Sequence, residues 1–198
     1  MRKIFSILTC LYFLVQGPLL ADTDEDAISI RFSCLAWDTT KANGIQYLNG
    51  EEVVTLRVGQ SNLNGPYAYT GANPIVFFRE QPGEEPGTVV REPVARAYIE
   101  PGLRDVLFLF TENSSENARN GGATQPRFNV LVMNHNYGAF PMGSFRIINL
   151  SQHEVGCILG EEKMIIPAKQ TKLVRSPAED RADMRVHFSM KIDEQWEP

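Results

Sequence analysis

The sequence contains little of what most catalytic and metal sites are built from. Its 198 residues include three cysteines, three histidines and two tryptophans. The histidines, His135, His153 and His187, lie far apart, and neither an HExxH nor a CxxC motif is present. No glycine-rich phosphate loop opens a helix. We therefore expect no catalytic residues, no metal and no cofactor.

Positive charge is also scarce, with 19 Lys and Arg against 24 Asp and Glu and a net charge of −5. Nucleic acid requires a basic face, so the acidity argues against such a partner. The longest apolar run, Ile4 to Val15, is too short for a transmembrane helix. We expect no transmembrane segment in the mature chain.

That apolar run belongs to a predicted signal peptide, residues 1–21. Arg2 and Lys3 precede it, and a small residue, Ala21, precedes the expected cleavage site. Cleavage removes two basic residues and no acidic ones, and the mature net charge becomes −7. The mature protein is therefore expected to be exported, either periplasmic or extracellular.

Cleavage also removes Cys10 and leaves two cysteines, Cys34 and Cys157. Both lie on apolar faces of strand-like segments. In an oxidising compartment an even pair is able to form a disulfide. The alternative is two unpaired thiols that are buried as small apolar side chains. The sequence leaves both open.

Period-two patterns dominate the mature chain and predict an all-β fold, most simply a β-sandwich. Apolar residues alternate with polar ones over 186–192, which predicts a half-buried strand. Residues 106–110 are apolar at every position, which predicts a strand covered on both faces. Asn49-Gly50 separates two strand-like runs and predicts a tight hairpin.

The chain contains a weak internal repeat, in which residues 45–61 align with residues 155–171. Ile30-Arg31-Phe32 likewise resembles Phe145-Arg146-Ile147. Two explanations are open. Either an immunoglobulin-like β unit was duplicated, or the match reflects residues that hairpins commonly share. Duplication predicts a first β unit at 22–110, a polar linker or long loop at 111–126 and a second β unit at 127–198.

Three aromatic residues are candidate binding residues: Trp37, Tyr67 and Tyr69. Tyr67 and Tyr69 share strand parity, so both rings lie on one face. Exposed rings on one face bind sugars or protein partners, whereas buried rings close the end of a sandwich. Both alternatives remain open here.

The stretch Phe140-Pro141-Met142-Gly143-Ser144 leads into the strand-like Phe145 to Asn149. With the similar strand at Ile30, it resembles uncharacterised exported bacterial proteins with tandem immunoglobulin-like β units. That resemblance carries no catalytic residues. Together with it, the signal peptide, the strand pattern, the repeat and the lack of a catalytic constellation predict a non-catalytic structural or protein-interaction role at the cell envelope. The expected partner is a protein or another envelope component. A sheet edge, for example by strand addition, and the face that carries Tyr67 and Tyr69 are the two alternative contact surfaces. The alternative is a carbohydrate-binding module that binds glycan through exposed aromatic rings.

Overall fold

The structure is a computed structural model that describes residues 27–113, 126–175 and 185–197. These residues form fourteen β-strands and one four-residue helix, α1 (Thr39–Ala42). The predicted all-β class is therefore confirmed. No helix in these ranges has the length and apolar character needed to cross a membrane. The predicted signal peptide, residues 1–21, lies outside the described residues.

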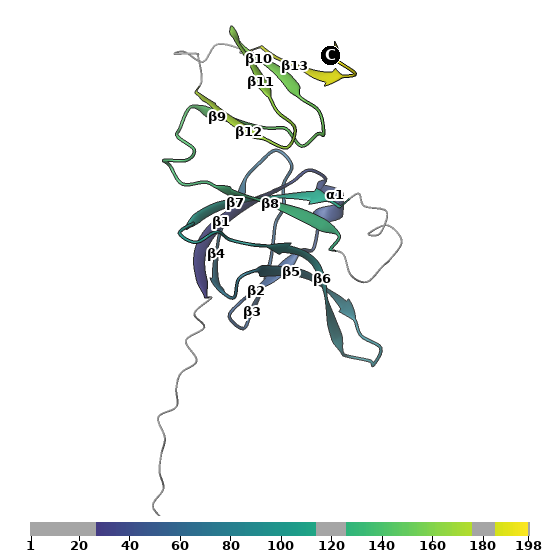
Figure 1. The fold of residues 1–198 in the computed structure, drawn as a ribbon. Helices are drawn as coiled ribbons and strands as arrows, with labels where there is room; N and C mark the ends of the chain where they lie inside the picture. Colours follow the sequence, from purple (N-terminus) through teal and green to yellow (C-terminus); the bar gives the residue numbers. More distant parts are fainter. Residues whose placement is uncertain (1–26, 114–125, 176–184, 198) are drawn as a thin grey trace, which may run out of the picture.

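Two four-stranded sheets pack face to face in the first half of the structure (Figure 1). One has the order β4 (Asn64–Gly71), β1 (Ile28–Ala36), β7 (Asp105–Glu112) and β8 (Phe128–Asn134). The other has the order β3 (Glu52–Thr55), β2 (Gln46–Asn49), β5 (Ile75–Pro82) and β6 (Val89–Ala97). Neighbouring strands are antiparallel except β1 and β7, which are parallel. This half is a β-sandwich, as the strand pattern predicts.

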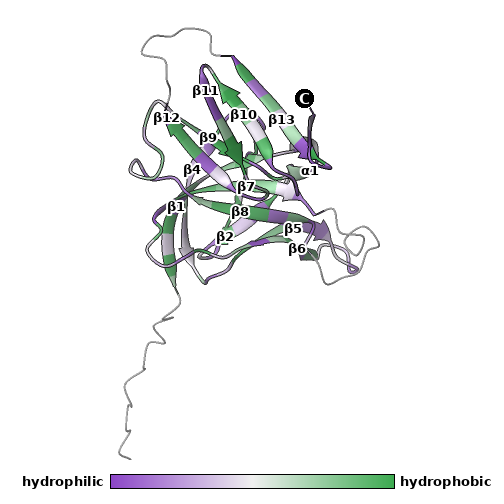
Figure 2. Ribbon diagram, turned by 45° about the horizontal axis from the view of Figure 1, so that its top comes forward, coloured by the Kyte–Doolittle hydropathy of each residue, from purple (hydrophilic) through white to green (hydrophobic). Residues whose placement is uncertain are grey.

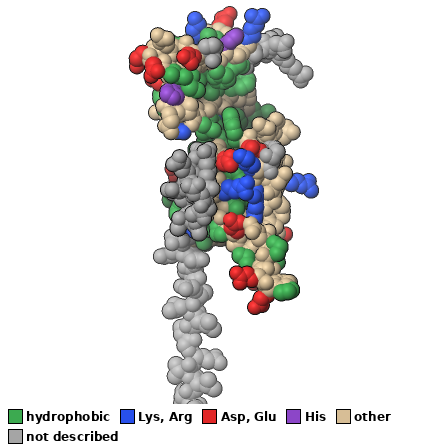
Figure 3. Space-filling model, turned by 90° about the vertical axis from the view of Figure 1, so that its right-hand side faces the viewer, with side chains coloured by type: hydrophobic (Ala, Val, Ile, Leu, Met, Phe, Trp, Pro, Cys, Tyr) green, Lys and Arg blue, Asp and Glu red, His purple; other side chains and the backbone are tan. Residues whose placement is uncertain are grey.

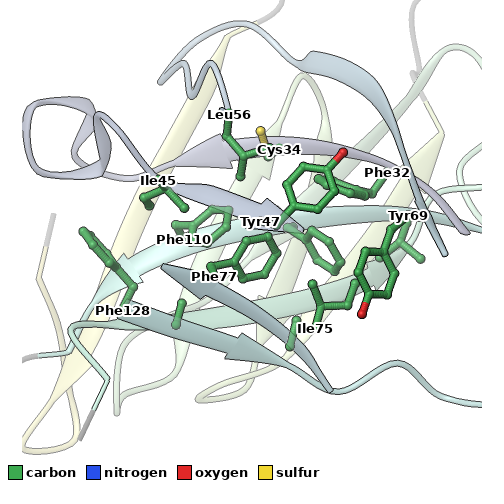
Figure 4. Close-up of a cluster of buried hydrophobic side chains, with 14 of the residues drawn as sticks. Phe32, Cys34, Ile45, Tyr47, Leu56, Tyr69, Ile75, Phe77, Phe110 and Phe128 are labelled. Carbon is green, nitrogen blue, oxygen red and sulfur yellow. The ribbon is translucent and has the colours of Figure 1, made fainter. Parts of the chain in front are cut away.

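The core between these sheets is rich in aromatic rings (Figure 4). Phe77 of β5 lies at its centre and is fully buried. Its ring centroid is 5.1 Å from that of Phe110 and 5.7 Å from that of Phe108, both on β7. Phe32 of β1 and Tyr47 of β2 also contact it. Alternate residues of four strands thus meet in one apolar layer, and their burial stabilises the sandwich.

The second half has one four-stranded and one two-stranded sheet. The larger has the order β11 (Glu162–Ile166), β10 (Val155–Leu159), β13 (Val186–Ile192) and β14 (Gln195–Glu197). The smaller pairs β12 (Thr171–Arg175) with β9 (Ser144–Ile148). Their shared core is small and consists of Cys157, Leu159, Met164, Ile166 and Val174, with Ile147 packed against it.

The two halves meet on the outer face of β7 and β8. Leu107, Leu109 and Met133 are buried there, and Ile148 and Leu150 pack against them. Because Val106, Phe108 and Phe110 face the sandwich core, β7 is covered on both faces. This arrangement confirms the prediction made from the continuous apolar run at residues 106–110.

The predicted linker at residues 111–126 separates two strands that the structure pairs. β8 is antiparallel to β7, and Phe128 belongs to the core of the first sandwich. Residues 128–134 therefore pack with the first half, whereas the sequence placed them in the second unit. A polar segment marks a connection, but its composition does not show whether the chain returns to the same sheet. Residues 114–125 lie outside the described ranges.

The predicted hairpin is confirmed, but its two loop residues are Gly50 and Glu51, and Asn49 belongs to the strand β2. Asn49 pairs with Glu52 across a loop of two residues, and the first of them, Gly50, has a φ of 62°. The same loop recurs between the paired residues Leu159 and Glu162, where Gly160 has a φ of 64°. Positive φ favours glycine at the first loop position. In the internal repeat Gly50-Glu51-Glu52 aligns with Gly160-Glu161-Glu162, and this shared turn accounts for the match.

Candidate functional site

The structure places Tyr67 and Tyr69 on the same face of β4, as their parity predicts, and that face is the core face. Tyr69 is buried, and the Tyr67 ring stacks on Phe32 with a centroid distance of 5.4 Å. The hydroxyl of Tyr69 donates a hydrogen bond to the carbonyl oxygen of Ala72 at 2.7 Å. Both rings pack into the sandwich, so neither offers an open surface for a sugar to stack on.

Trp37, the third predicted binding residue, directly follows β1 and is 68% exposed. Its backbone N–H donates to the carbonyl oxygen of Phe110 at 2.9 Å, which anchors the end of the strand. Trp37 is therefore a single exposed ring, separated from the two tyrosines that parity places together. The carbohydrate-binding alternative loses the multi-ring platform on which it depended.

The two cysteines lie in different cores. Cys34 belongs to the core of the first sandwich and Cys157 to the small core of the second half, and both are free and buried. Burial raises the pKa of the Cys34 thiol to about 12 and raises the pKa of Cys157 as well. The structure therefore supports the alternative of two buried thiols and not the disulfide.

We expect both thiols to resist alkylation in the folded protein. Alkylation needs an accessible thiolate, and burial here disfavours both access and deprotonation. Intact mass after iodoacetamide treatment should show no modification of Cys34 or Cys157 in native buffer and two modifications in denaturant. A native adduct, or a mass two hydrogens lower without reductant, would contradict this arrangement.

A hollow of about 420 Å³ lies where the loop after β8 meets the middle of β1 and the start of β7, and its lining includes Ser33, Asp105 and His135. These three residue types are also those of a catalytic triad. The Asp105 carboxylate, however, accepts hydrogen bonds from Arg31, from Nη2 at 2.7 Å and from Nε at 3.0 Å. The carboxylate is thus held by an arginine and not by the histidine.

The His135 ring belongs to a separate cluster. It stacks on the Phe140 ring with a centroid distance of 5.4 Å. The Arg146 guanidinium carbon lies 4.7 Å from the centroid of the Phe140 ring. Nδ1 of His135 is buried without a hydrogen-bond partner. Burial, followed by the charge of Arg146, lowers the pKa of His135. In a Ser-His-Asp triad the carboxylate holds Nδ1 of the histidine, so this arrangement is not that of a triad.

The most unusual surface is on the second half. β13 alternates apolar and polar residues as predicted, which Figure 2 shows as bands of green and purple. Phe188 and Val186 lie opposite Cys157 and Leu159 of β10, so they share the core face of that sheet. Yet Phe188 is 54% exposed and Val186 is 45% exposed. We call this surface, formed by Phe188 and Val186, the open face.

Further apolar side chains on the second half are exposed, and Figure 3 shows such side chains on the surface of this part. They are Phe145, Ile158, Ile165, Leu173 and Trp196. The sequence predicted a half-buried strand at residues 186–192 with its apolar side chains inward. The direction is correct, but the predicted burial is wrong for Val186 and Phe188, which remain exposed. No sequence pattern reports this, because parity assigns a residue to a face and does not show what lies against that face.

Within the described residues, no group of three or more His, Cys, Asp or Glu side chains is placed to hold a metal ion. Comparison with known proteins finds no matching family model, no matching curated protein and no matching solved structure.

Proposed function

We propose that this protein is exported and that it acts as a non-catalytic β-sandwich protein with a protein-interaction role at the cell envelope. The single observation that carries the proposal is the open face, where two apolar side chains on the core side of a sheet are exposed. Exposed apolar surface of this kind marks sites of protein contact. The signal peptide predicted from residues 1–21 supports export.

The two halves differ in their cores and surfaces, which supports different roles for them. The first sandwich has an extensive aromatic core, which suits a rigid scaffold. The second half has a core of five buried residues and concentrates exposed apolar side chains, which suits a contact surface. The hollow beside Asp105 does not have the geometry of a Ser-His-Asp triad, because Arg31 engages the carboxylate and Nδ1 of His135 has no partner.

Affinity capture tests this function. The mature chain, residues 22–198, is immobilised and incubated with an envelope fraction of the source cells, and bound proteins are quantified by mass spectrometry. We expect a reproducible partner whose recovery falls at least about tenfold when the bait carries Phe188→Asp, because a buried carboxylate disfavours apolar contact. Recovery of no protein in repeated captures would overturn the proposal.

A further inference from the structure

The two halves share one strand topology. The order β3-β2-β5-β6 of the first half corresponds to β11-β10-β13-β14 of the second, and the pair β4-β1 corresponds to β12-β9. Each corresponding pair of neighbours is antiparallel in both halves. The sequence match of Ile30-Arg31-Phe32 with Phe145-Arg146-Ile147 aligns β1 with β9 independently of the topology. Six strands therefore correspond in order, while β7 and β8 have no counterpart among the described residues.

In the first half, β7 completes the sheet beside β1. The backbone N–H of Arg31 donates to the carbonyl oxygen of Arg104 at 2.7 Å, just before β7, and residues 31–36 pair with residues 105–110 in parallel. The inward side chains of β7 are Val106, Phe108 and Phe110, which cover β5 from the opposite sheet. As a result Ile75 and Phe77 of β5 are fully buried.

In the second half, the corresponding edge of β9 is unpaired. Among the described strands, β9 pairs with β12 alone. The N–H of Asn149 donates to Gln170 on the β12 side at 2.9 Å. Because backbone groups alternate between the two sides of a strand, Arg146 and Ile148 direct their N–H groups to the free edge. Arg146 is the counterpart of Arg31, whose N–H is bonded toward β7.

A strand added at the free edge of β9, in the position that β7 has beside β1, would cover the open face. β13 corresponds to β5, and its inward residues Phe188 and Val186 are exposed, whereas Phe77 of β5 is buried by the rings of β7. One absent strand thus explains both the unpaired edge of β9 and the uncovered side chains of β13. Unrelated surface exposure would not place both features at the same position of the same topology.

The rest of the mature chain contains no sequence suited to fill this position. Residues 22–26 and 114–125 contain no large apolar residue, and residues 176–184 contain one, Met184. A strand like β7 needs apolar side chains at alternate positions to cover the open face. None of these segments supplies such a strand, so the occupant is expected to come from outside residues 22–198.

We propose that the second half is an incomplete copy of the first sandwich, and that it binds an extended segment of a partner protein as an added strand parallel to β9. This inference deepens the proposed function and rests on it. Large apolar residues at alternate positions of the added strand cover Phe188 and Val186. Backbone hydrogen bonds to Arg146 and Ile148 hold the strand, and the apolar contacts select it.

The first half supplies a probe for this position. The peptide has the sequence of residues 105–112 with Leu107→Thr and Leu109→Thr, which keeps the inward-facing Val and two Phe and makes the outward side polar. Fluorescence anisotropy measures its binding to the mature chain, and a scrambled peptide with both Phe adjacent is the control. We expect saturable binding of the alternating peptide, with an affinity at least about tenfold above that of the scrambled one.

Matched variants of the protein locate the peptide. Phe188→Asp should weaken its binding at least about tenfold, because the strand would bury the new carboxylate. Ile165→Asp should change binding less than about twofold. Ile165 is equally exposed, at 54%, but pairs with Gly156 on the opposite face of the same sheet. Val186→Asp provides a second substitution on the open face if Phe188→Asp fails to fold.

The direction of the added strand is testable with a nitroxide label at the amino end of the peptide. If the strand is parallel, the peptide's first residue lies beside Arg146, as Asp105 lies beside Arg31. The label should then broaden the amide resonance of Ser144 more than that of Ser151. The reverse pattern would overturn the parallel register.

Two other outcomes would overturn the proposal. Absence of peptide binding would show that the position does not accept a strand, while the capture experiment would still decide the broader interaction role. A dimer of the mature chain in sedimentation velocity, dissociated by Phe188→Asp but not by the peptide, would identify a second copy as the occupant. If the peptide binds but no partner is captured, the proposal that β9 accepts an added strand stands and the proposed role at the cell envelope is contradicted.

Discussion

Phe77→Ala is expected to lower the free energy of unfolding of the first sandwich by about 4 kcal/mol. The Phe77 ring is fully buried between the two sheets, within 6.4 Å of the rings of Phe32, Tyr47, Phe108 and Phe110. Removal of the ring leaves a cavity that rigid aromatic neighbours fill poorly. Urea denaturation followed by tyrosine fluorescence measures the loss.

The neighbouring residue supplies the control for this prediction. Val76 lies on the opposite face of β5 and is partly exposed. Val76→Ala should cost less than about 1 kcal/mol, because it removes little buried surface. Equal losses for Phe77→Ala and Val76→Ala would show that Phe77 is not at the centre of the core.

Asn149→Ala is expected to destabilise the second half by about 3 kcal/mol. Asn149 is 5% exposed, and its Nδ2 lies within 3.0 Å of the carbonyl oxygens of His153, Ile166 and Pro167. Its side chain thereby ties the end of β9 to the end of β11. Alanine would remove this donor from the three carbonyl oxygens in a region whose apolar core is small, and only the His153 carbonyl would keep another side-chain donor, the Ser151 hydroxyl at 3.1 Å. Hydrogen exchange of the β10 and β11 amides should accelerate, while amides of β5 and β7 should not change.

Ser151→Ala is the matched control. The Ser151 hydroxyl donates to Oδ1 of Asn149 at 2.7 Å, but its loss leaves the two N–H donors of Nδ2 in place beside the three carbonyl oxygens. We expect a cost below about 1 kcal/mol. If Asn149→Ala had no larger effect than Ser151→Ala, the asparagine would not be the residue that joins these strands.

Local patterns predicted the features that depend on a few adjacent residues. The hairpin at Gly50 follows from the backbone freedom of glycine, which needs no information about distant segments. The period-two pattern of residues 186–192 correctly placed Phe188 and Val186 on the inner face of their sheet. The unbroken apolar run at Val106 to Phe110 correctly indicated a strand covered on both sides.

Predictions that required knowledge of distant partners were less complete. Parity placed Tyr67 and Tyr69 on one face but left open whether that face was core or surface. The polar segment at residues 111–126 suggested a boundary between units, although β7 and β8 on either side of it are paired. The parallel pairing of β1 with β7 joins residues more than 70 positions apart, and no local signal reports it.

The sequence by itself determined the class of the protein: strand periodicity, turn glycines and scarce helix signals permit only an all-β fold, because these preferences act over a few residues. The tertiary structure alone decided which strands became neighbours, that Cys34 and Cys157 entered separate cores, and that β13 was left uncovered. Those outcomes depend on which distant segments cover each face. The hydrophobic effect favours burial of apolar surface by any segment, so it does not by itself select which distant segment covers a given face.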